Sequence, residues 1–401
     1  MSNKIQYLLL YLILVFAFSL RIYGISWDSG NHLHPDERAI ILSVLGLRFP
    51  TSIESFLSPE SSWNTHFFAY GSFPFYLLKI LGDIASIFDP SLSGYDGIQL
   101  VGRFISSIFD VGTVLVLFFL GKKLKGERVG LLAAFFYAIS VLPIQLSHFY
   151  AVDTPLTFFI TLTLLLLIRF YEKPTLLRSL LVGIFFGFAL ATKISAIVIT
   201  ATIGITLTID FLLIFLKRPH RLDVWGPHLP PFTKRLLKDA IIFIVATIFT
   251  YLILSPYTFI DFLSFQRQTA EQSAMTKNAF TFPYTLQYVG KTPYFYELKN
   301  IFLYGIGPLL AAVCFVGLII FLLEMVKKYR SIDFAKHTIL IVFFIAYFGV
   351  VGGFAIGFMR YMLPLYPLLC LFGSVLIYKL LTIFPPRPQN GSIKQFPKEQ
   401  Q

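Results

Sequence analysis

Residues 5–24, IQYLLLYLILVFAFSLRIYG, decide the class of fold. About 20 mostly apolar residues are needed to cross the hydrocarbon core of a bilayer as a helix. Inside that core each backbone amide must find its partner within the segment, because no water is present. No small-residue cleavage site follows the stretch, so we expect a retained transmembrane helix and not a removed signal peptide.

Further apolar runs of similar length follow along the chain. They span 104–121, 129–147, 153–170, 178–192, 194–216, 239–256, 301–325, 338–356 and 361–382. Hydrophobic residues make up 56% of the chain and charged residues 13%, whereas soluble domains average about 45–50% and about 25%. The runs are continuously apolar, not alternating as in a membrane barrel. The sequence therefore predicts an all-α, polytopic membrane protein with about ten transmembrane helices.

The formal net charge of +12 could indicate a nucleic-acid partner, but the basic residues gather in short loops between apolar runs. Placing the N-terminus in the cytoplasm puts about two thirds of the Lys and Arg residues on the inner side, in line with the positive-inside rule. The acidic residues then concentrate on the outer side. We expect no nucleic-acid partner, and a multi-pass protein of the cytoplasmic membrane with its polar chemistry on the extracytoplasmic face.

Two outer loops are long, at residues 25–103 and 257–300. Within the first, Thr65 to Ser86 is apolar and aromatic but interrupted by Pro74, so it should lie along the membrane interface. Residues 1–384 are expected to form one transmembrane catalytic domain. Residues 385–401 are rich in Pro and polar residues and are expected to form a disordered cytoplasmic tail.

The segment His34-Pro35-Asp36-Glu37-Arg38 follows the first apolar run. Two adjacent carboxylates at a bilayer surface are costly to desolvate without a role, because their charges repel. One of them could act as a general base, steadied by Arg38. The alternative is a helix start, with Pro35 in the first turn and the acids favouring the N-terminal dipole. From the residues alone both interpretations stay open.

A second acid, Asp153, lies in the short outer turn 148–155, HFYAVDTP. Helix capping by Asp153 or Thr154, with Pro155 in the first turn, would explain it. In the functional interpretation Asp153 faces Asp36 across a cavity and completes a two-carboxylate site for sugar transfer.

Basic residues on the outer side are few and are placed at helix ends: Arg38, Arg103, Lys193 and Arg360. A transferase that releases a phosphate-bearing lipid needs cations where negative charge develops. Interaction with phospholipid headgroups is the alternative. We favour phosphate binding for at least one of Lys193 and Arg103.

The outer side also holds histidines and aromatic residues. His32, His34, His66 and His148 could bind a divalent metal with Asp36, but their spacing matches no metal signature, so no metal is predicted. The loop that contains Tyr284 and Tyr288 could stack on a sugar or cover the site. An interfacial aromatic belt explains it equally well.

Taken in order, these segments resemble a known family. After HPDE come FAYGSFPFYLL (68–78), GRFISSIFDVGTVLVLFFLGKKL (102–124), SHFYAVDTPLTFF (147–159), GFALATKISA (187–196), FPYTLQYVGKTPYFYELKNIFLYGIGP (282–308) and FMRYMLPLYPLL (358–369). The series is similar to the lipid-linked-sugar transferases of the GT-C fold. Within them it is most similar to the bacterial branch related to protein O-mannosyltransferases and the lipid A aminoarabinose transferase, like glycosyltransferase family 39.

The resemblance implies inverting transfer of a hexose-type sugar from a polyprenyl-phosphate donor to a hydroxyl of a protein or glycolipid acceptor, outside the membrane and without a required cofactor. Asp36 would be the general base, Glu37 would orient the site, and Asp153 would contact donor or acceptor. The donor phosphate would be held by Arg38, Arg103 and Lys193. Substrate contacts are expected from His34, His148, Tyr70, Tyr284, Tyr288 and Arg360. The chain continues little beyond the last apolar run, so the C-terminal domain of larger members is not expected.

The main rival is a flippase or transporter of lipid-linked sugars. It would use the same phosphate-binding cations but would not need paired acids on one face. Transporters place charges near the bilayer midplane, whereas here the charges gather at the outer surface. A noncatalytic assembly subunit is the other alternative, and it would have little use for the arrangement of HPDE and Asp153.

Overall fold

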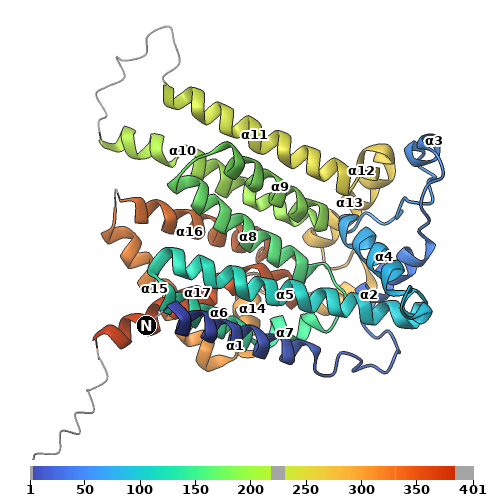
Figure 1. The fold of residues 1–401 in the computed structure, drawn as a ribbon, viewed down its shortest axis with the longest axis horizontal. Helices are drawn as coiled ribbons and strands as arrows, with labels where there is room; N and C mark the ends of the chain where they lie inside the picture. Colours follow the sequence, from blue (N-terminus) through green and yellow to red (C-terminus); the bar gives the residue numbers. More distant parts are fainter. Residues whose placement is uncertain (1–2, 218–230, 330, 384–401) are drawn as a thin grey trace, which may run out of the picture.

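The computed structural model describes residues 3–217, 231–329 and 331–383, and within them it contains helices and no strand. The all-α prediction is therefore confirmed. The expected tail 385–401 and part of the inner loop 217–238 lie outside the described residues. Long helices lie side by side along the horizontal axis of the molecule (Figure 1).

Seven helices within the described ranges are long and apolar enough to cross a membrane. In the structure these helices are α1 (Asn3–Ile22), α5 (Tyr95–Lys125), α8 (Asp153–Glu172), α11 (Pro231–Leu254), α15 (Pro308–Lys327), α16 (Ile332–Val351) and α17 (Tyr366–Ile383) with the short η6 (Met359–Leu365) before it. A bent pair raises the count to eight. The chain is a multi-pass membrane protein, with fewer full-length spans than the ten predicted.

The bent pair is α6 (Glu127–Ala138) and α7 (Val141–Ser147), which meet at 61°. We expected one continuous helix over 129–147. Pro143 has no N–H to donate and its ring excludes a carbonyl one turn earlier. Ser140 also donates its hydroxyl to the Phe136 carbonyl, which bends helices. These residues break the expected helix.

The two remaining predicted runs form shorter helices. They are α9 (Leu176–Thr192) and α10 (Ile199–Lys217), which the short helix η2 (Ile194–Val198) precedes. The break between them is at Lys193, whose backbone is extended. The predicted run 301–325 is also interrupted: a π-helical turn, η5 (Ile301–Gly305), ends before Gly307 at φ 93°, and α15 begins at Pro308.

Short helices fill both of the long loops that were predicted to lie on the outer side. The first loop contains α2 (Pro35–Gly46), α3 (Ile53–Leu57), α4 (Phe73–Ala85) and η1 (Pro90–Ser93). The second contains α12 (Tyr257–Ile260), α13 (Phe262–Lys277), η4 (Pro283–Tyr288) and α14 (Phe295–Asn300). Figure 1 shows α2, α3, α4 and α12 together at one end of the long helices. The two loops that carry the predicted chemistry thus meet at one end of the bundle.

Helix packing follows the rules of membrane interiors, where small residues let backbones approach. Gly183 and Gly187 face α11, and a Cβ at Gly183 would come within 2.6 Å of the Ala246 Cβ. The Thr247 hydroxyl donates to the Gly183 carbonyl across this contact at 3.1 Å.

One buried ion pair joins the first helix to the bundle. Arg21 Nε lies 2.5 Å from Asp110 Oδ2, and both side chains are fully buried. Tyr137 donates its hydroxyl to the other Asp110 oxygen at 2.6 Å. The network ties α1 to α5 and α6, and α5 in turn contacts α2, α4 and α8.

Candidate active site

The segment His34-Pro35-Asp36-Glu37 is a helix start. His34 is the N-cap of α2, with its Nδ1 accepting from the Glu37 amide at 3.4 Å, and Pro35 occupies the first turn. The interpretation of this motif as a helix start is therefore correct. It does not exclude function, because the two acids that follow Pro35 point to different surroundings.

Glu37 points inward and is fully buried. Its carboxylate accepts two hydrogen bonds from Arg103, from Nε at 3.0 Å and from Nη2 at 2.7 Å. Arg103, also fully buried, donates to both oxygens of Asp28 at 3.0 and 2.8 Å and to the Ile25 carbonyl. The guanidinium is thus satisfied within the protein. This geometry favours a structural role for Arg103, and its predicted contact with a donor phosphate has no geometric support.

Asp28 shows the electrostatic effect of this network. Burial alone would raise its pKa, but hydrogen bonds from Arg103 and Gln99 outweigh burial and hold the pKa well below its usual range. Asp28 is therefore ionised at neutral pH, as its partner Arg103 requires.

Glu37 also positions the turn that carries Asp153. Its Oε1 accepts from the Tyr150 amide at 2.8 Å, and the Tyr150 hydroxyl donates to the Pro74 carbonyl at 2.6 Å. Tyr150 packs so closely on α5 that a Cβ at Gly102 would lie 2.7 Å from its side chain. These contacts hold the start of α2, and with it Asp36, next to the turn that carries Asp153.

Asp36 and Asp153 meet at Arg360. Arg360 Nη1 lies 2.6 Å from Asp36 Oδ2, and its Nε lies 3.5 Å from Asp153 Oδ2. Lys193 Nζ donates to the other Asp153 oxygen at 2.8 Å. Four residues predicted from the sequence are thus brought together from α2, α8, the α9–η2 break and η6.

The capping explanation of Asp153 is wrong. Helix α8 has Val152 as its N-cap, without a side-chain hydrogen bond, and Asp153 is its first residue. The carboxylate is therefore free to face Lys193 and Arg360.

These ion pairs are close but incompletely hydrogen-bonded. Asp36 Oδ2, Asp153 Oδ2 and Arg360 Nε are buried without a hydrogen-bond partner among the described residues. The buried groups around Glu37 have theirs. Buried polar atoms without partners are uncommon in folded proteins, and a ligand bound next to these acids could supply the missing hydrogen bonds.

Aromatic rings surround the two cations. Lys193 Nζ lies 4.4 Å from the centre of the Tyr361 ring and 5.9 Å from that of Tyr70. Tyr70 comes close because Gly71 follows it: a Cβ at Gly71 would lie 1.9 Å from the Ala191 carbonyl oxygen, at the end of α9. The Gly71 amide donates to the Thr192 carbonyl at 3.0 Å.

Burial perturbs two titratable side chains at the site. Burial lowers the pKa of His34 below 6.5, partly offset by the negative charge of Asp36. Burial, reinforced by the charge of Asp36, raises the pKa of Tyr70 well above 10. At neutral pH both are uncharged.

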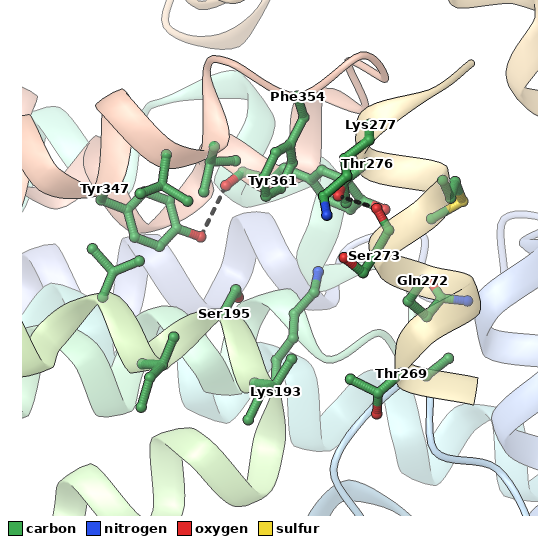
Figure 2. Close-up of a pocket in the computed structure, with 17 residues that line it drawn as sticks. Lys193, Ser195, Thr269, Gln272, Ser273, Thr276, Lys277, Tyr347, Phe354 and Tyr361 are labelled. Carbon is green, nitrogen blue, oxygen red and sulfur yellow. Dashed lines mark hydrogen bonds between the residues drawn. The ribbon is translucent and has the colours of Figure 1, made fainter. Parts of the chain in front are cut away.

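A cavity of about 400 Å³ opens beside this cluster. Figure 2 shows the Lys193 side chain extending into it, with Ser273 and Thr276 of α13 across from it and Tyr347 and Tyr361 on another side. The Tyr347 hydroxyl donates to the Tyr361 carbonyl at 3.0 Å, which fixes that side. An apolar wall comes from η2, the end of α16 and the turn after it, and includes Ile194, Ile197, Val198, Val350, Val351 and Phe354.

The polar wall of the cavity was missed from the sequence. It comes from one face of α13, with Thr269, Gln272, Ser273, Thr276 and Lys277. The first four lie at helical spacing, which could have indicated a polar face. Lys277 is exposed and makes no ion pair with any described residue. The cavity is thus apolar on the side of η2 and α16 and polar on the side of α13, and one lysine lines it from each side: Lys193 before η2 and Lys277 on α13.

Other predicted residues lie elsewhere. Arg38 is exposed on α2 and has no ion pair among the described residues. His148 has both ring nitrogens next to carbonyl oxygens, of Ile144 at 2.7 Å and of Tyr23 at 2.9 Å. Tyr284 is exposed, whereas Tyr288 is buried against Phe358. Their substrate-binding roles stay predictions.

The second-loop tyrosines are nevertheless affected by the site. Burial raises the pKa of Tyr288 to about 12. Burial and the Tyr361 and Asp36 side chains raise the pKa of Tyr284. Both therefore present protonated hydroxyls at neutral pH.

The histidines considered for metal binding have separate partners. His32 pairs with Asp96 at 3.3 Å, and His66 lies 3.8 Å from Asp261. Across the described part of the chain, no three His, Cys, Asp or Glu side chains are grouped so that they could hold a metal ion.

Comparison with known proteins places this geometry in context. The family model for dolichyl-phosphate-mannose-protein mannosyltransferases matches residues 94–231. That range includes Arg103, the Asp153 turn and Lys193. Among proteins of curated function, none matches the chain in sequence.

Several solved structures share the fold. The Archaeoglobus fulgidus oligosaccharyltransferase in complex with Zn and sulfate aligns with a TM-score of 0.56 and 18% identity, over 94% of this chain and 49% of that one. The same enzyme with an inhibitory peptide and a dolichol-phosphate gives 0.57 and 17%, over 94% and 50%. ArnT from Cupriavidus metallidurans bound to undecaprenyl phosphate gives 0.57 and 13%, over 94% and 61%.

These similarities confirm the resemblance at the level of the fold. The chain has the GT-C architecture of membrane glycosyltransferases, with several short helices between the first and second long apolar helices. It spans about half the length of the archaeal relatives and 61% of ArnT.

Proposed function

We propose that this chain is a membrane glycosyltransferase that moves a sugar of the hexose type from a polyprenyl-phosphate donor to an acceptor hydroxyl. The observation that carries the proposal is the pair Asp36 and Asp153, joined by Arg360 and linked through Lys193 to a largely apolar cavity that Lys193 and Lys277 line. A carboxylate base and a phosphate-binding cavity are the two parts that such a transfer needs.

In the proposed reaction Asp36 accepts the proton of the acceptor hydroxyl. The oxygen attacks the anomeric carbon from the face opposite the phosphate, while the bond between that carbon and the phosphate oxygen breaks. The glycosidic bond forms with inversion, and the electron pair leaves with the polyprenyl phosphate. The base is one of two acids on different elements, as in other inverting sugar chemistry.

Negative charge grows on the departing phosphate, so cations near it stabilise the transition state. Lys193 and Lys277 line the cavity and are the candidates for this role. The apolar wall suits the first isoprene units of the lipid. Two of the structural relatives are described with dolichol-phosphate or undecaprenyl phosphate bound, which agrees with this choice of donor.

The remaining residues receive supporting roles. Glu37, through Arg103 and Tyr150, holds Asp36 and the Asp153 turn together. Tyr70, protonated and next to Lys193, is positioned to donate to a sugar or phosphate oxygen. The orientation that follows from the basic loops puts this end of the bundle outside the cytoplasmic membrane.

The test uses membranes containing the protein, radiolabelled polyprenyl-phosphate hexose, and separate protein and glycolipid acceptor fractions. Wild-type protein should transfer label to one fraction, whereas Asp36→Asn should not. Equal transfer by both would contradict the assignment of the base. Lipid translocation without donor turnover would instead support a flippase.

A further inference from the structure

The centre of the site holds an arginine where two carboxylates converge. Arg360 lies 2.6 Å from Asp36 and 3.5 Å from Asp153, and its side chain is only 16% exposed. A cation that bridges two carboxylates is the usual arrangement of a divalent metal site. Here the bridging cation is the side chain of Arg360.

The charges around the two acids already balance. Asp36 and Asp153 contribute two negative charges, and Arg360 and Lys193 contribute two positive charges within 3.5 Å. An added divalent ion would meet a guanidinium and an ammonium at the carboxylates that should bind it. Repulsion between like charges at this range in a partly desolvated site is strong.

One structural relative, the archaeal oligosaccharyltransferase, is described in complex with Zn and sulfate. The residues of this chain do not fit such an ion. Arg360 and Lys193 already lie against the two carboxylates that would have to bind it. His34 faces the Phe149 ring at 4.3 Å and the Glu37 amide.

Arg360 is also held rigidly. Its guanidinium carbon lies 4.8 Å from the Phe358 ring centre and 5.6 Å from that of Tyr361. The segment before it is fixed by Lys291, which donates to the Ile356 carbonyl at 3.0 Å and pairs with buried Glu297. A fixed cation costs little reorganisation when charge moves during a reaction.

We propose that Arg360 is the resident counter-cation of the two-carboxylate site and occupies the position of a divalent metal, so that transfer proceeds without one. The proposal rests on the function proposed above. It has a direct consequence: removing the guanidinium leaves two facing carboxylates and creates a divalent-cation site that the wild-type protein lacks.

The test measures Mn²⁺ binding to the purified full-length protein, stripped with EDTA, by the loss of the free-ion signal in electron paramagnetic resonance. Arg360→Ala should bind Mn²⁺ at least tenfold more tightly than wild type, and adding Asp153→Asn should abolish the gain. Arg267→Ala removes an exposed arginine of α13 and should behave as wild type. If Arg360→Ala fails to fold, Arg360→Gln takes its place, and its folding is checked by size-exclusion chromatography.

Two binding results would overturn the proposal. One is wild-type binding of Mn²⁺ that Asp36→Asn removes, and the other is a folded Arg360 variant that gains no Mn²⁺ binding. In parallel, sugar transfer by wild type should be unchanged by EDTA, and a requirement for Mn²⁺ would likewise contradict the proposal. If no donor is transferred at all, the proposed function fails, while the binding measurement still decides the role of Arg360.

Discussion

Asp36 and Glu37 are neighbours in sequence, yet they belong to two clusters of different character. Glu37 is fully buried, and its partners Arg103, Gln99 and the Tyr150 amide satisfy it with hydrogen bonds of 2.7 to 3.3 Å. Asp36 is partly exposed, and its close contact with Arg360 lacks hydrogen-bond alignment. The Glu37 carboxylate is held by hydrogen bonds, whereas the Asp36 carboxylate has an oxygen without a hydrogen-bond partner among the described residues.

Two neighbouring residues of one helical turn therefore differ in the role that suits them, one structural and one chemical. A satisfied buried network holds its members in one arrangement and resists proton transfer, because each change of charge breaks a bond. A partly exposed carboxylate with an unaligned counter-ion is better suited to accept a proton. We therefore propose a structural role for Glu37 and Arg103 and a catalytic role for Asp36.

The largest effect should come from Asp36→Asn. The substitution keeps the shape of the side chain but removes its basicity, and a general base contributes roughly 10²–10⁴-fold to rate. We expect the transfer rate to fall by that factor while the thermal unfolding temperature stays near that of wild type. Initial rates with labelled donor and a thermal scan of the same sample check this.

Glu37→Gln should show the opposite pattern. It leaves Arg103 with one carboxylate fewer in a buried site, and breaking a buried ion pair costs roughly 3–5 kcal/mol. The protein should unfold at a clearly lower temperature, while the folded fraction retains most of its transfer rate. A wild-type unfolding temperature would mean that the network is not structural.

Removing the unpaired cation of the cavity should have a smaller effect. Lys277→Met should raise the donor KM about tenfold, the loss of about 1.4 kcal/mol of binding, with little change in kcat. Lys299→Met removes an exposed lysine of α14 outside the cavity and provides the matched control. Equal donor KM values for the two variants would exclude Lys277 from donor binding.

The smallest effect concerns pH. Because the folded-state pKa of His34 is below 6.5, only the unfolded chain gains a proton there as the pH falls just below 6.5. Stability linked to His34 is complete above pH 6.5 and is lost below it. Wild-type protein should thus lose more thermal stability between pH 7.5 and 5.5 than His34→Gln, measured in the same detergent.

Much of the fold followed from the sequence, because apolar runs and backbone satisfaction in lipid leave few alternatives. The position of Arg103 within its helix did not follow from the sequence. The apolar run was expected to begin at residue 104, which put Arg103 at a helix end, whereas α5 begins at Tyr95 and carries Arg103 within the part of the helix that contacts α2 and α4. Polar first turns of a membrane helix escape a search for apolar runs.

The candidate site, too, was predicted only in part from the sequence. Asp36, Asp153, Lys193 and Arg360 were predicted and lie together. Which of the two adjacent acids meets Arg360 depends on how α2 packs against α5, and no local pattern specifies that. Helix α13 was missed because it is polar, so neither hydropathy nor the aromatic residues of its loop drew attention to Thr269, Gln272, Ser273 and Lys277.

The most direct test compares Asp36→Asn and Glu37→Gln in parallel, with transfer rate per folded molecule and unfolding temperature measured on each. We predict that Asp36→Asn loses transfer and keeps stability, and that Glu37→Gln loses stability and keeps transfer. Retained transfer in Asp36→Asn, or the same profile for both variants, would contradict the separation of the two carboxylates.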